Sequence, residues 1–313
     1  ARIQDSNIFG EGKLASIGTT LSTNEQSVSL SYGQSWLFNK PISTNISLSY
    51  SHSNNYALRD KILPSGDIDN DYYYMQYEQN QFSLGLSLGH RWTPNFAILT
   101  LSGGVTSSLI NNLYDDSLWI PYDTSISQYS DNWEPRNSIW TSFSMDGRNI
   151  SWDPSSGWFA SQRLSWYGLV HEGFLPFAPD WGETEFYLRT DTKAEKYFTL
   201  VNKPITDSWA LKLVLMGYSG LSFQFSALDS TIKKNNQLYI DGMFNGRGWT
   251  IYNSDKGRGK ALWCNSLELR MPVIPGIFSL DLWGDAVAIT DEPYQFFNLK
   301  EDDWYFSFGP SFR

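Results

Sequence analysis

The chain has 313 residues, a formal net charge of −10 at pH 7, 18% charged residues and 16% aromatic residues. Proteins that bind nucleic acid through their overall charge are basic, and disordered chains are poor in aromatic residues, so both classes are excluded. The mean hydropathy is −0.37 and no run approaches about 18 apolar residues, which excludes a helical membrane protein.

The predicted elements are almost all strands, because apolar and polar residues alternate with a period of two along most of the chain. Residues 42–50 read ISTNISLSY, and residues 82–89 read FSLGLSLG. Each such stretch has one apolar and one polar face, because successive side chains of a strand point to opposite sides. In chain order the predicted strands, about twelve, are 12–21, 27–38, 42–52, 81–92, 97–110, 137–146, 158–169, 184–200, 208–225, 260–272, 277–288 and 303–313.

A soluble β-sandwich and a transmembrane β-barrel both produce this alternation, with the apolar faces turned inward in the first and toward lipid in the second. Two features favour the barrel: polar faces of Ser, Thr, Asn and Gly, and stretches of about 9–13 residues, near the roughly 9–11 that cross a bilayer. A third is Trp near the ends of the stretches, as in an aromatic girdle: Trp36, Trp92, Trp158, Trp209 and Trp304. We therefore predict an all-β chain, a transmembrane antiparallel β-barrel that occupies residues 1–313 as one domain.

The connections between the predicted strands alternate in length. Short turns are expected at 38–41, 93–96 and 201–206, and long acidic or aromatic loops at about 53–80, 112–136, 171–183 and 226–258. Short turns on one side and long loops on the other are typical of an outer-membrane barrel whose long loops lie outside the cell.

Five short motifs stand out in this predicted barrel. The longest loop, about 226–258, carries NGRGW, which contains Gly246, Arg247, Gly248 and Trp249. The next two strands carry ELRMP, beginning at Glu268, and WGDA, which contains Asp285. Earlier in the chain, DGRN and PSSG form a hairpin with Asp146, Arg148, Pro154 and Gly157, and residues 7–13 read NIFGEGK.

In this order and spacing the five motifs resemble the BamA-type family of outer-membrane β-barrel assembly factors, within the POTRA-transporter superfamily. That family has a barrel of about 16 strands with an Arg-Gly-aromatic loop tip inside it, and periplasmic repeat domains precede the barrel. The resemblance implies a protein of the bacterial outer membrane that folds and inserts client β-barrel proteins through a weakly paired lateral seam. It also implies accessory assembly lipoproteins and the lipid bilayer as partners, and no cofactor.

The faces of the two strands after the long loop suggest a role for its arginine. If Leu267 faces lipid, Glu268 faces the lumen, and the alternation of the following strand places Asp285 there too. An arginine carried in by the loop can pair with both carboxylates and so hold the loop inside the barrel as a latch. Without the resemblance, an exposed turn arginine with no fixed partner is the favoured interpretation.

Alternatives remain for how much of the family barrel this chain contains and for its function. The segment 303–313 resembles the fourteenth strand of the family barrel, which predicts a fragment lacking about two strands at each end and the periplasmic domains; alternatively, it closes a smaller barrel. Besides protein assembly, the function considered is two-partner secretion or solute conduction by a channel of the same superfamily, or adhesion through the long loops. Because no nucleophile triad, phosphate loop or metal-ligand pattern is readable, we predict that the chain is not an enzyme and binds neither metal nor nucleic acid.

Overall fold

The computed structural model describes residues 1–8, 10–121, 126–127, 130, 133–169, 185–206, 210–226, 232–249, 257–274 and 277–313. The strands in these ranges are β1 (Arg2–Ile8), β2 (Lys13–Leu21), β3 (Glu25–Gln34), β4 (Ile42–Ile62), β5 (Ile68–Trp92), β6 (Ile98–Leu113), β7 (Trp119–Pro121), β8 (Glu134–Asp146), β9 (Gly157–Tyr167), β10 (Tyr187–Pro204), β11 (Ala210–Ser226), β12 (Leu238–Tyr239), β13 (Arg258–Gly259), β14 (Ala261–Ile274), β15 (Phe278–Thr290) and β16 (Trp304–Phe312). The short 3-10 helices are η1 (Lys234–Asn236), η3 (Pro293–Asn298) and η4 (Glu301–Asp303). Among the described residues, no helix combines the length and hydropathy needed to cross a membrane.

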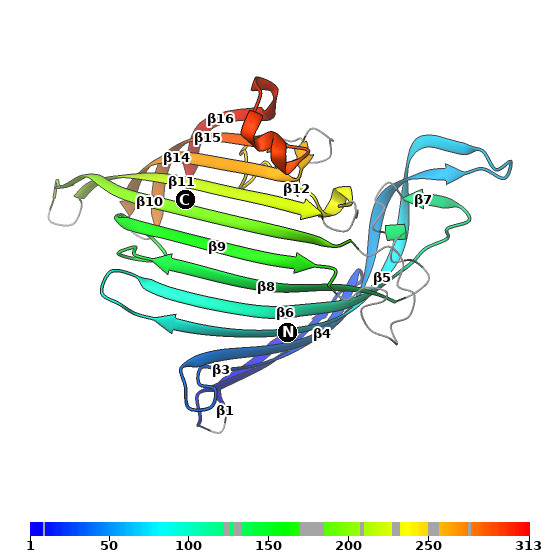
Figure 1. The fold of residues 1–313 in the computed structure, drawn as a ribbon, viewed down its shortest axis with the longest axis horizontal. Coiled ribbons are helices and arrows are strands. Elements are labelled where there is room, and N and C mark those ends of the chain that lie inside the picture. Colours follow the sequence, from blue (N-terminus) through cyan, green and yellow to red (C-terminus); the bar gives the residue numbers. More distant parts are fainter. Residues whose placement is uncertain are drawn as a thin grey trace.

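The main sheet is a curved antiparallel meander (Figure 1). Its order is β1-β2-β3-β4-β5-β6-β8-β9-β10-β11-β14-β15-β16, with the short β7 paired to β4, while β12 and β13 form a separate ribbon. Each long strand pairs with its predecessor, as the period-two segments and their turns predict. All twelve predicted strands are present, with most boundaries shifted by a few residues and with β4 and β5 extended well beyond the predicted ends, and β1 adds a thirteenth strand to the meander.

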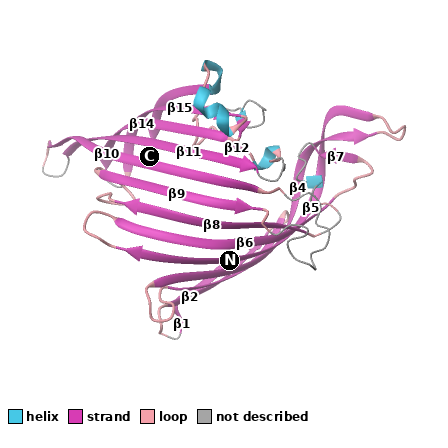
Figure 2. Cartoon of the chain, viewed as in Figure 1, coloured by secondary structure: helices cyan, strands magenta, loops and turns pink. Residues whose placement is uncertain are grey.

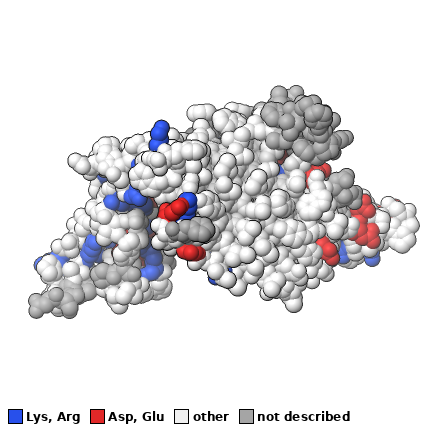
Figure 3. Space-filling model, turned by 90° about the horizontal axis from the view of Figure 1, so that it is seen from below, with Lys and Arg blue, Asp and Glu red and all other residues white. Residues whose placement is uncertain are grey.

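The two faces of the sheet differ as the alternation predicts. Leu84, Leu86 and Leu88 are between 44% and 48% exposed on the outer face, and Ile46 pairs with Leu86 there. On the inner face Ser47 pairs with Gly85. The space-filling view shows a broad band without charged side chains between the two ends of the strands, where Lys, Arg, Asp and Glu gather (Figure 3). An uncharged outer band around a polar inner face is the arrangement of a transmembrane barrel wall.

The connections also divide between the two ends of the sheet (Figure 2). The connections 35–41 and 93–97 lie at one end, which we call the short-turn end. The strands joined by the long connections, β6 and β8, β9 and β10, and β11 and β14, meet these connections at the opposite, long-loop end, where the short turns 22–24 and 63–67 also lie. The predicted loop 171–183 lies outside the described residues, and only parts of 112–136 and 226–258 are described.

One predicted loop is wrong. Residues 53–80 are mostly strand, because β4 and β5 continue as a paired ribbon from Asn54–Glu78 to Ile62–Ile68. The turn lies only at 63–67, where Gly66 has a φ of 86°. Both faces of this ribbon are rich in polar residues, so it lacks the alternation of a membrane-facing strand and looks like a loop in sequence. The predicted turn 201–206 is also too long, since β10 continues to Pro204.

The main hydrophobic core lies on the inner side of the sheet, under the long loop. Leu238 and Ile240 of the loop pack on inner-face residues of β14 and β15: Leu262, Cys264, Val287 and Ile289. Gln224 of β11 is fully buried beneath the loop, with its amide donating to the Asn236 carbonyl at 2.7 Å and its Oε1 accepting from the Leu238 N–H at 3.2 Å. The described part of the long loop therefore belongs to the lumen.

Candidate functional site

The inner faces of β14 and β15 place a row of polar side chains below the loop core. The strand register pairs Ser266 with Asp285 and Arg270 with Asp281. Glu268 lies between them, two residues from each β14 partner, so its side chain shares the same face. The predicted luminal carboxylates, Glu268 and Asp285, therefore occupy adjacent strands on one surface.

The tip of the loop is shaped by a turn that sequence analysis did not single out. The Asp241 Oδ1 atom accepts hydrogen bonds from the backbone N–H groups of Met243, Phe244 and Asn245 at 2.8, 2.6 and 2.9 Å. One carboxylate thus satisfies three consecutive donors and fixes the backbone before the arginine. The Asp-Gly pair at 241–242 is the signal in the sequence that could have found this turn.

Two glycines flank the arginine in conformations that other residues avoid. Gly246 has a φ of 66° and Gly248 a φ of 85°. At Gly246 an added Cβ would also lie 2.8 Å from Cγ2 of Ile240, whereas at Gly248 it would meet nothing within 4 Å. Gly246 is therefore required for both backbone conformation and packing, and Gly248 for conformation alone.

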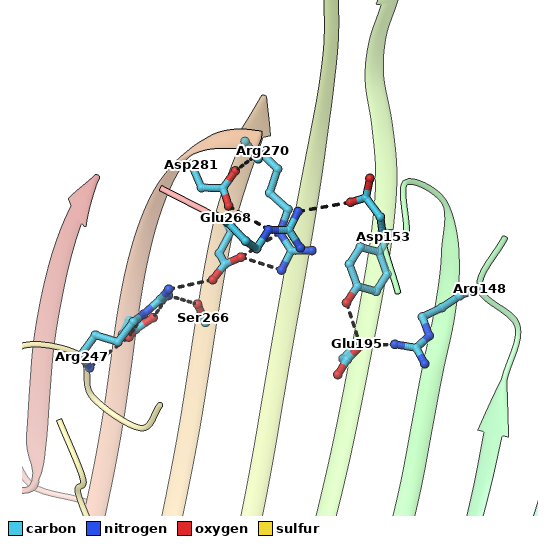
Figure 4. Close-up of polar contacts among 12 residues, drawn as sticks. Arg148, Asp153, Glu195, Arg247, Ser266, Glu268, Arg270 and Asp281 are labelled. Carbon is cyan, nitrogen blue, oxygen red and sulfur yellow. Dashed lines mark hydrogen bonds and ion pairs between the residues drawn. The ribbon is translucent and has the colours of Figure 1, made fainter. Parts of the chain in front are cut away.

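Arg247 is held by both strands (Figure 4). Its Nε and Nη2 atoms donate to the two oxygens of Asp285 at 2.8 and 2.6 Å, and Nη1 donates to Glu268 at 2.8 Å. Nη2 also donates to Ser266 at 2.8 Å, and the guanidinium lies 4.0 Å from the ring centroid of Trp283. This bidentate, stacked arrangement is specific for arginine, because lysine has no planar fork.

The cluster around Arg247 is largely shielded from water. The side chains of Asp285, Glu268 and Arg247 are 4%, 12% and 22% exposed. Burial alone would lower the pKa of the Arg247 guanidinium, but hydrogen bonding to Asp285 and the charges of Asp285 and Glu268 more than offset this and raise it. Arg247 is therefore a permanent cation that compensates two buried carboxylates.

A second arginine extends the cluster along the wall. Arg270 donates through Nε and Nη2 to the other oxygen of Glu268 at 2.8 and 2.7 Å. Its guanidinium also lies 5.4 Å from the ring of Tyr197 on β10. The Tyr197 hydroxyl donates to Glu195 at 2.8 Å. The contacts thus run from the loop tip across β14 to β10.

Trp249 fixes the far side of the loop tip. Its indole N–H donates to the Phe306 carbonyl of β16 at 3.2 Å, and its ring packs edge-on against Tyr305 at 5.1 Å between centroids. The tip therefore contacts three consecutive strands of the main sheet, through Arg247 to β14 and β15 and through Trp249 to β16.

The hairpin between β8 and β9 is the second predicted site. Arg148 donates to both oxygens of Asp146 at 2.9 and 2.8 Å and forms an ion pair with Glu195 at 3.4 Å. Hydrogen bonding to Asp146 raises the pKa of Arg148. Gly157 has a φ of 103°, and a Cβ there would lie 2.2 Å from the Gly147 carbonyl; Pro154 is buried. The hairpin is thus a closely packed turn with an ion pair directed toward β10.

The structure joins the two predicted sites into one belt of polar contacts, with Glu195, Tyr197 and Arg270 between them (Figure 4). Sequence analysis missed Ser266, Trp283, Glu195 and Tyr197 as members. Strand parity could have placed all four in the lumen, but it does not say which luminal residues come into contact.

In the early NIFGEGK motif, the Asn7 side chain accepts from the Gly12 N–H at 2.7 Å and closes the β1–β2 turn. Within the described part of the chain, no three His, Cys, Asp or Glu side chains lie close enough to hold a metal ion.

Comparison with known protein families and sequences gives a consistent result. Residues 7–313 match the model of the Omp85 superfamily domain. The chain is also 33% identical over 308 residues to a protein of Treponema pallidum (strain Nichols) that bears the name of an outer membrane protein assembly factor. This match covers 91% of the chain but 35% of the relative. The chain thus spans about a third of the length of that protein.

Solved structures share the fold at low sequence identity. BamA from Haemophilus ducreyi, crystallised without POTRA domains 1–3, matches with a TM-score of 0.61 and 16% identity, over 99% of this chain and 60% of that one. CdiB from Acinetobacter baumannii matches with a TM-score of 0.53 and 11% identity, over 100% of this chain and 49% of that one. The predicted barrel architecture is confirmed, and the family match over nearly the whole chain gives its identity: this is a bacterial outer-membrane protein that belongs to the Omp85 superfamily.

Proposed function

We propose that this chain is the membrane domain of a factor that folds β-barrel proteins and inserts them into the outer membrane. Its clients are outer-membrane proteins, its further partners are accessory assembly lipoproteins and the bilayer, and the process makes or breaks no covalent bond. The likeness to a relative with an assembly-factor name supports this role. The observation that supports this role most directly is the ion pairing of Arg247 with Asp285 and Glu268.

In this proposal the loop is a latch that holds the C-terminal part of the wall in one arrangement. Arg247 bridges β14 and β15, and Trp249 reaches β16. A client strand is templated by unpaired N–H and C=O groups at a sheet edge, which requires neighbouring strands to keep a fixed register and curvature. The latch supplies that rigidity from inside, so the chain contributes the scaffold next to the seam.

The test replaces Arg247 in the full-length protein. Arg247→Ala and Arg247→Glu are expected to leave the barrel inserted, as shown by heat-modifiable migration, but to lower the yield of a folded client in proteoliposomes at least several-fold. Arg163→Ala is the matched control, because Arg163 is a luminal arginine of β9 whose Nε donates to Ser165 at 3.3 Å and whose guanidinium lies 4.2 Å from the ring centroid of Trp140, rather than contacting the loop. Normal client assembly by both Arg247 variants would refute the latch.

A channel of the same superfamily is the second candidate, and the inner face of the N-terminal strands favours it. That face carries small uncharged residues such as Ser31, Ser47 and Gly85. A wide lumen lined in this way would conduct solutes. Large, stable single-channel currents that are insensitive to Arg247→Ala would support conduction over assembly.

A further inference from the structure

The connection between β15 and β16 carries an aromatic surface that the latch does not use. It contains η3 and η4 at the long-loop end of the sheet (Figure 2). Within η3, Phe296 packs on the wall, whereas Phe297 and Tyr294 are 86% and 71% exposed. An exposed phenylalanine that adjoins a contiguous group of aromatic rings indicates a surface that contacts more than water.

Phe296 lies on the outer face of the sheet. Its ring packs edge-on against Phe223 of β11 at 5.1 Å and Trp263 of β14 at 5.7 Å between centroids. Trp263 points outward, because its neighbour Cys264 belongs to the inner core. Trp304 of β16 continues the group with its ring 5.5 Å from Trp263. These four residues, Phe223, Trp263, Phe296 and Trp304, therefore belong to the lipid-facing wall. Phe297 adjoins them through Phe296, with ring centroids 5.8 Å apart, and the five residues together are called the outer aromatic patch.

The opposite side of η3 is polar and faces the mouth of the lumen. Tyr294, Gln295 and Asn298 line a cleft of about 850 Å³ together with the inner-face residues Ile289 and Tyr305. Before the helix, Glu292 pairs with Lys260 at 2.5 Å. After it, Lys300 and Glu301 are exposed charges. The connection thus bends over the rim of the wall, with aromatic rings outside and polar groups inside.

We propose that η3 is an interfacial anchor that inserts Phe297 into the outer leaflet beside the lipid headgroups. The occupant of this surface is lipid, because the outer aromatic patch continues the lipid-facing wall without a break and lies where the strands end. Aromatic residues at this level form the girdle that sets a barrel's depth in the bilayer. The anchor therefore fixes the rim of β14, β15 and β16, and with it the mouth of the lumen above the loop.

The test measures the depth of single sites in the full-length protein. In a Cys264→Ala background, Phe297→Cys, Asn298→Cys and Glu301→Cys are each spin-labelled and reconstituted into phosphatidylcholine–phosphatidylglycerol vesicles. Accessibility to oxygen, which partitions into the bilayer, is compared with accessibility to a water-soluble nickel chelate. We expect the oxygen-to-nickel ratio at position 297 to exceed that at 298 and 301 several-fold.

Two outcomes would overturn the anchor. Equal ratios at 297 and 301 would place η3 in water, and a label at 297 that neither reagent reaches would indicate a protein contact. Phe297→Trp, tested by quenching with brominated lipids, gives a second readout with a bulky aromatic side chain in place, and an unquenched tryptophan would likewise overturn the anchor. Because neither measurement depends on client assembly, failure of the anchor and failure of the proposed function are distinguishable.

Discussion

The N-terminal wall, β2 to β6, and the C-terminal wall, β10 to β16, share one outer face and differ on the inner one. In the N-terminal wall the inner side chains are small and pair through hydroxyls, as in Ser16–Ser31 at 2.7 Å and Ser83–Ser108 at 2.8 Å. In the C-terminal wall the inner face also carries charged and apolar side chains, several of which contact the loop. The outer face is therefore similar along the whole sheet, because it contacts lipid throughout. The inner face differs between the two walls, and only that of the C-terminal wall holds the latch around Arg247.

The two walls also differ in how many strands their inner contacts join. A serine pair links neighbouring strands only, whereas Arg247 and Trp249 connect a loop to three strands at once. Loss of one hydroxyl leaves water free to replace it, but loss of one charge in a buried cluster leaves its partner uncompensated. The same sheet therefore combines a region that tolerates substitution with one that does not.

The largest effect is expected for Asp285→Ala. This change leaves Glu268, which Arg247 shares with Arg270, as the remaining carboxylate partner of Arg247, and it should lower the free energy of unfolding by about 3–5 kcal/mol. Urea unfolding in phospholipid vesicles, compared with Glu268→Ala, measures the effect. A loss below about 1 kcal/mol would mean that the cluster is solvated and that the two walls are alike in this respect.

The next effect concerns the backbone of the loop tip. Gly246→Ala should cost about 2–3 kcal/mol, because it combines a positive φ with a clash against Ile240. Gly248→Ala is the matched control, with a positive φ and open space, and should cost about 1–2 kcal/mol. Equal losses in the same unfolding assay would show that packing against Ile240 does not matter.

Arg148→Ala tests whether the hairpin at the short-turn end belongs to the C-terminal network. It removes a bidentate bond to Asp146 and the ion pair with Glu195, and should cost about 1.5–3 kcal/mol. A double-mutant cycle with Glu195→Gln separates the two contacts. A coupling energy near zero in that cycle would disconnect the hairpin from β10.

The smallest effect is expected in the N-terminal wall. Ser16→Ala removes one partly buried hydroxyl pair with Ser31 and should change the free energy of unfolding by about 0.5–1 kcal/mol. The same urea titration applies. A loss as large as that of Asp285→Ala would contradict the contrast between the two walls.

Alternation along the chain by itself determined the all-β class, the twelve strands, their pairing in sequence order and the side on which Glu268 and Asp285 lie. These features are local, since the face of a strand residue depends only on its position in the period and each hairpin joins neighbours. The ribbon within 53–80 was missed because both of its faces carry many polar residues, including the buried Arg59, so its sequence lacks the apolar–polar alternation of the membrane-facing strands.

Only the tertiary structure decided which luminal groups meet. The pairing of Arg247 with Asp285 and Glu268 was predicted through the family motifs, not through alternation. It depends on how a loop folds back across several strands, and no period in the sequence encodes that path. The same holds for Arg270 against Tyr197 and for Trp249 against β16. Such contacts join residues far apart in the chain, and their geometry is set by the curvature of the whole sheet and the packing of the loop on its inner face.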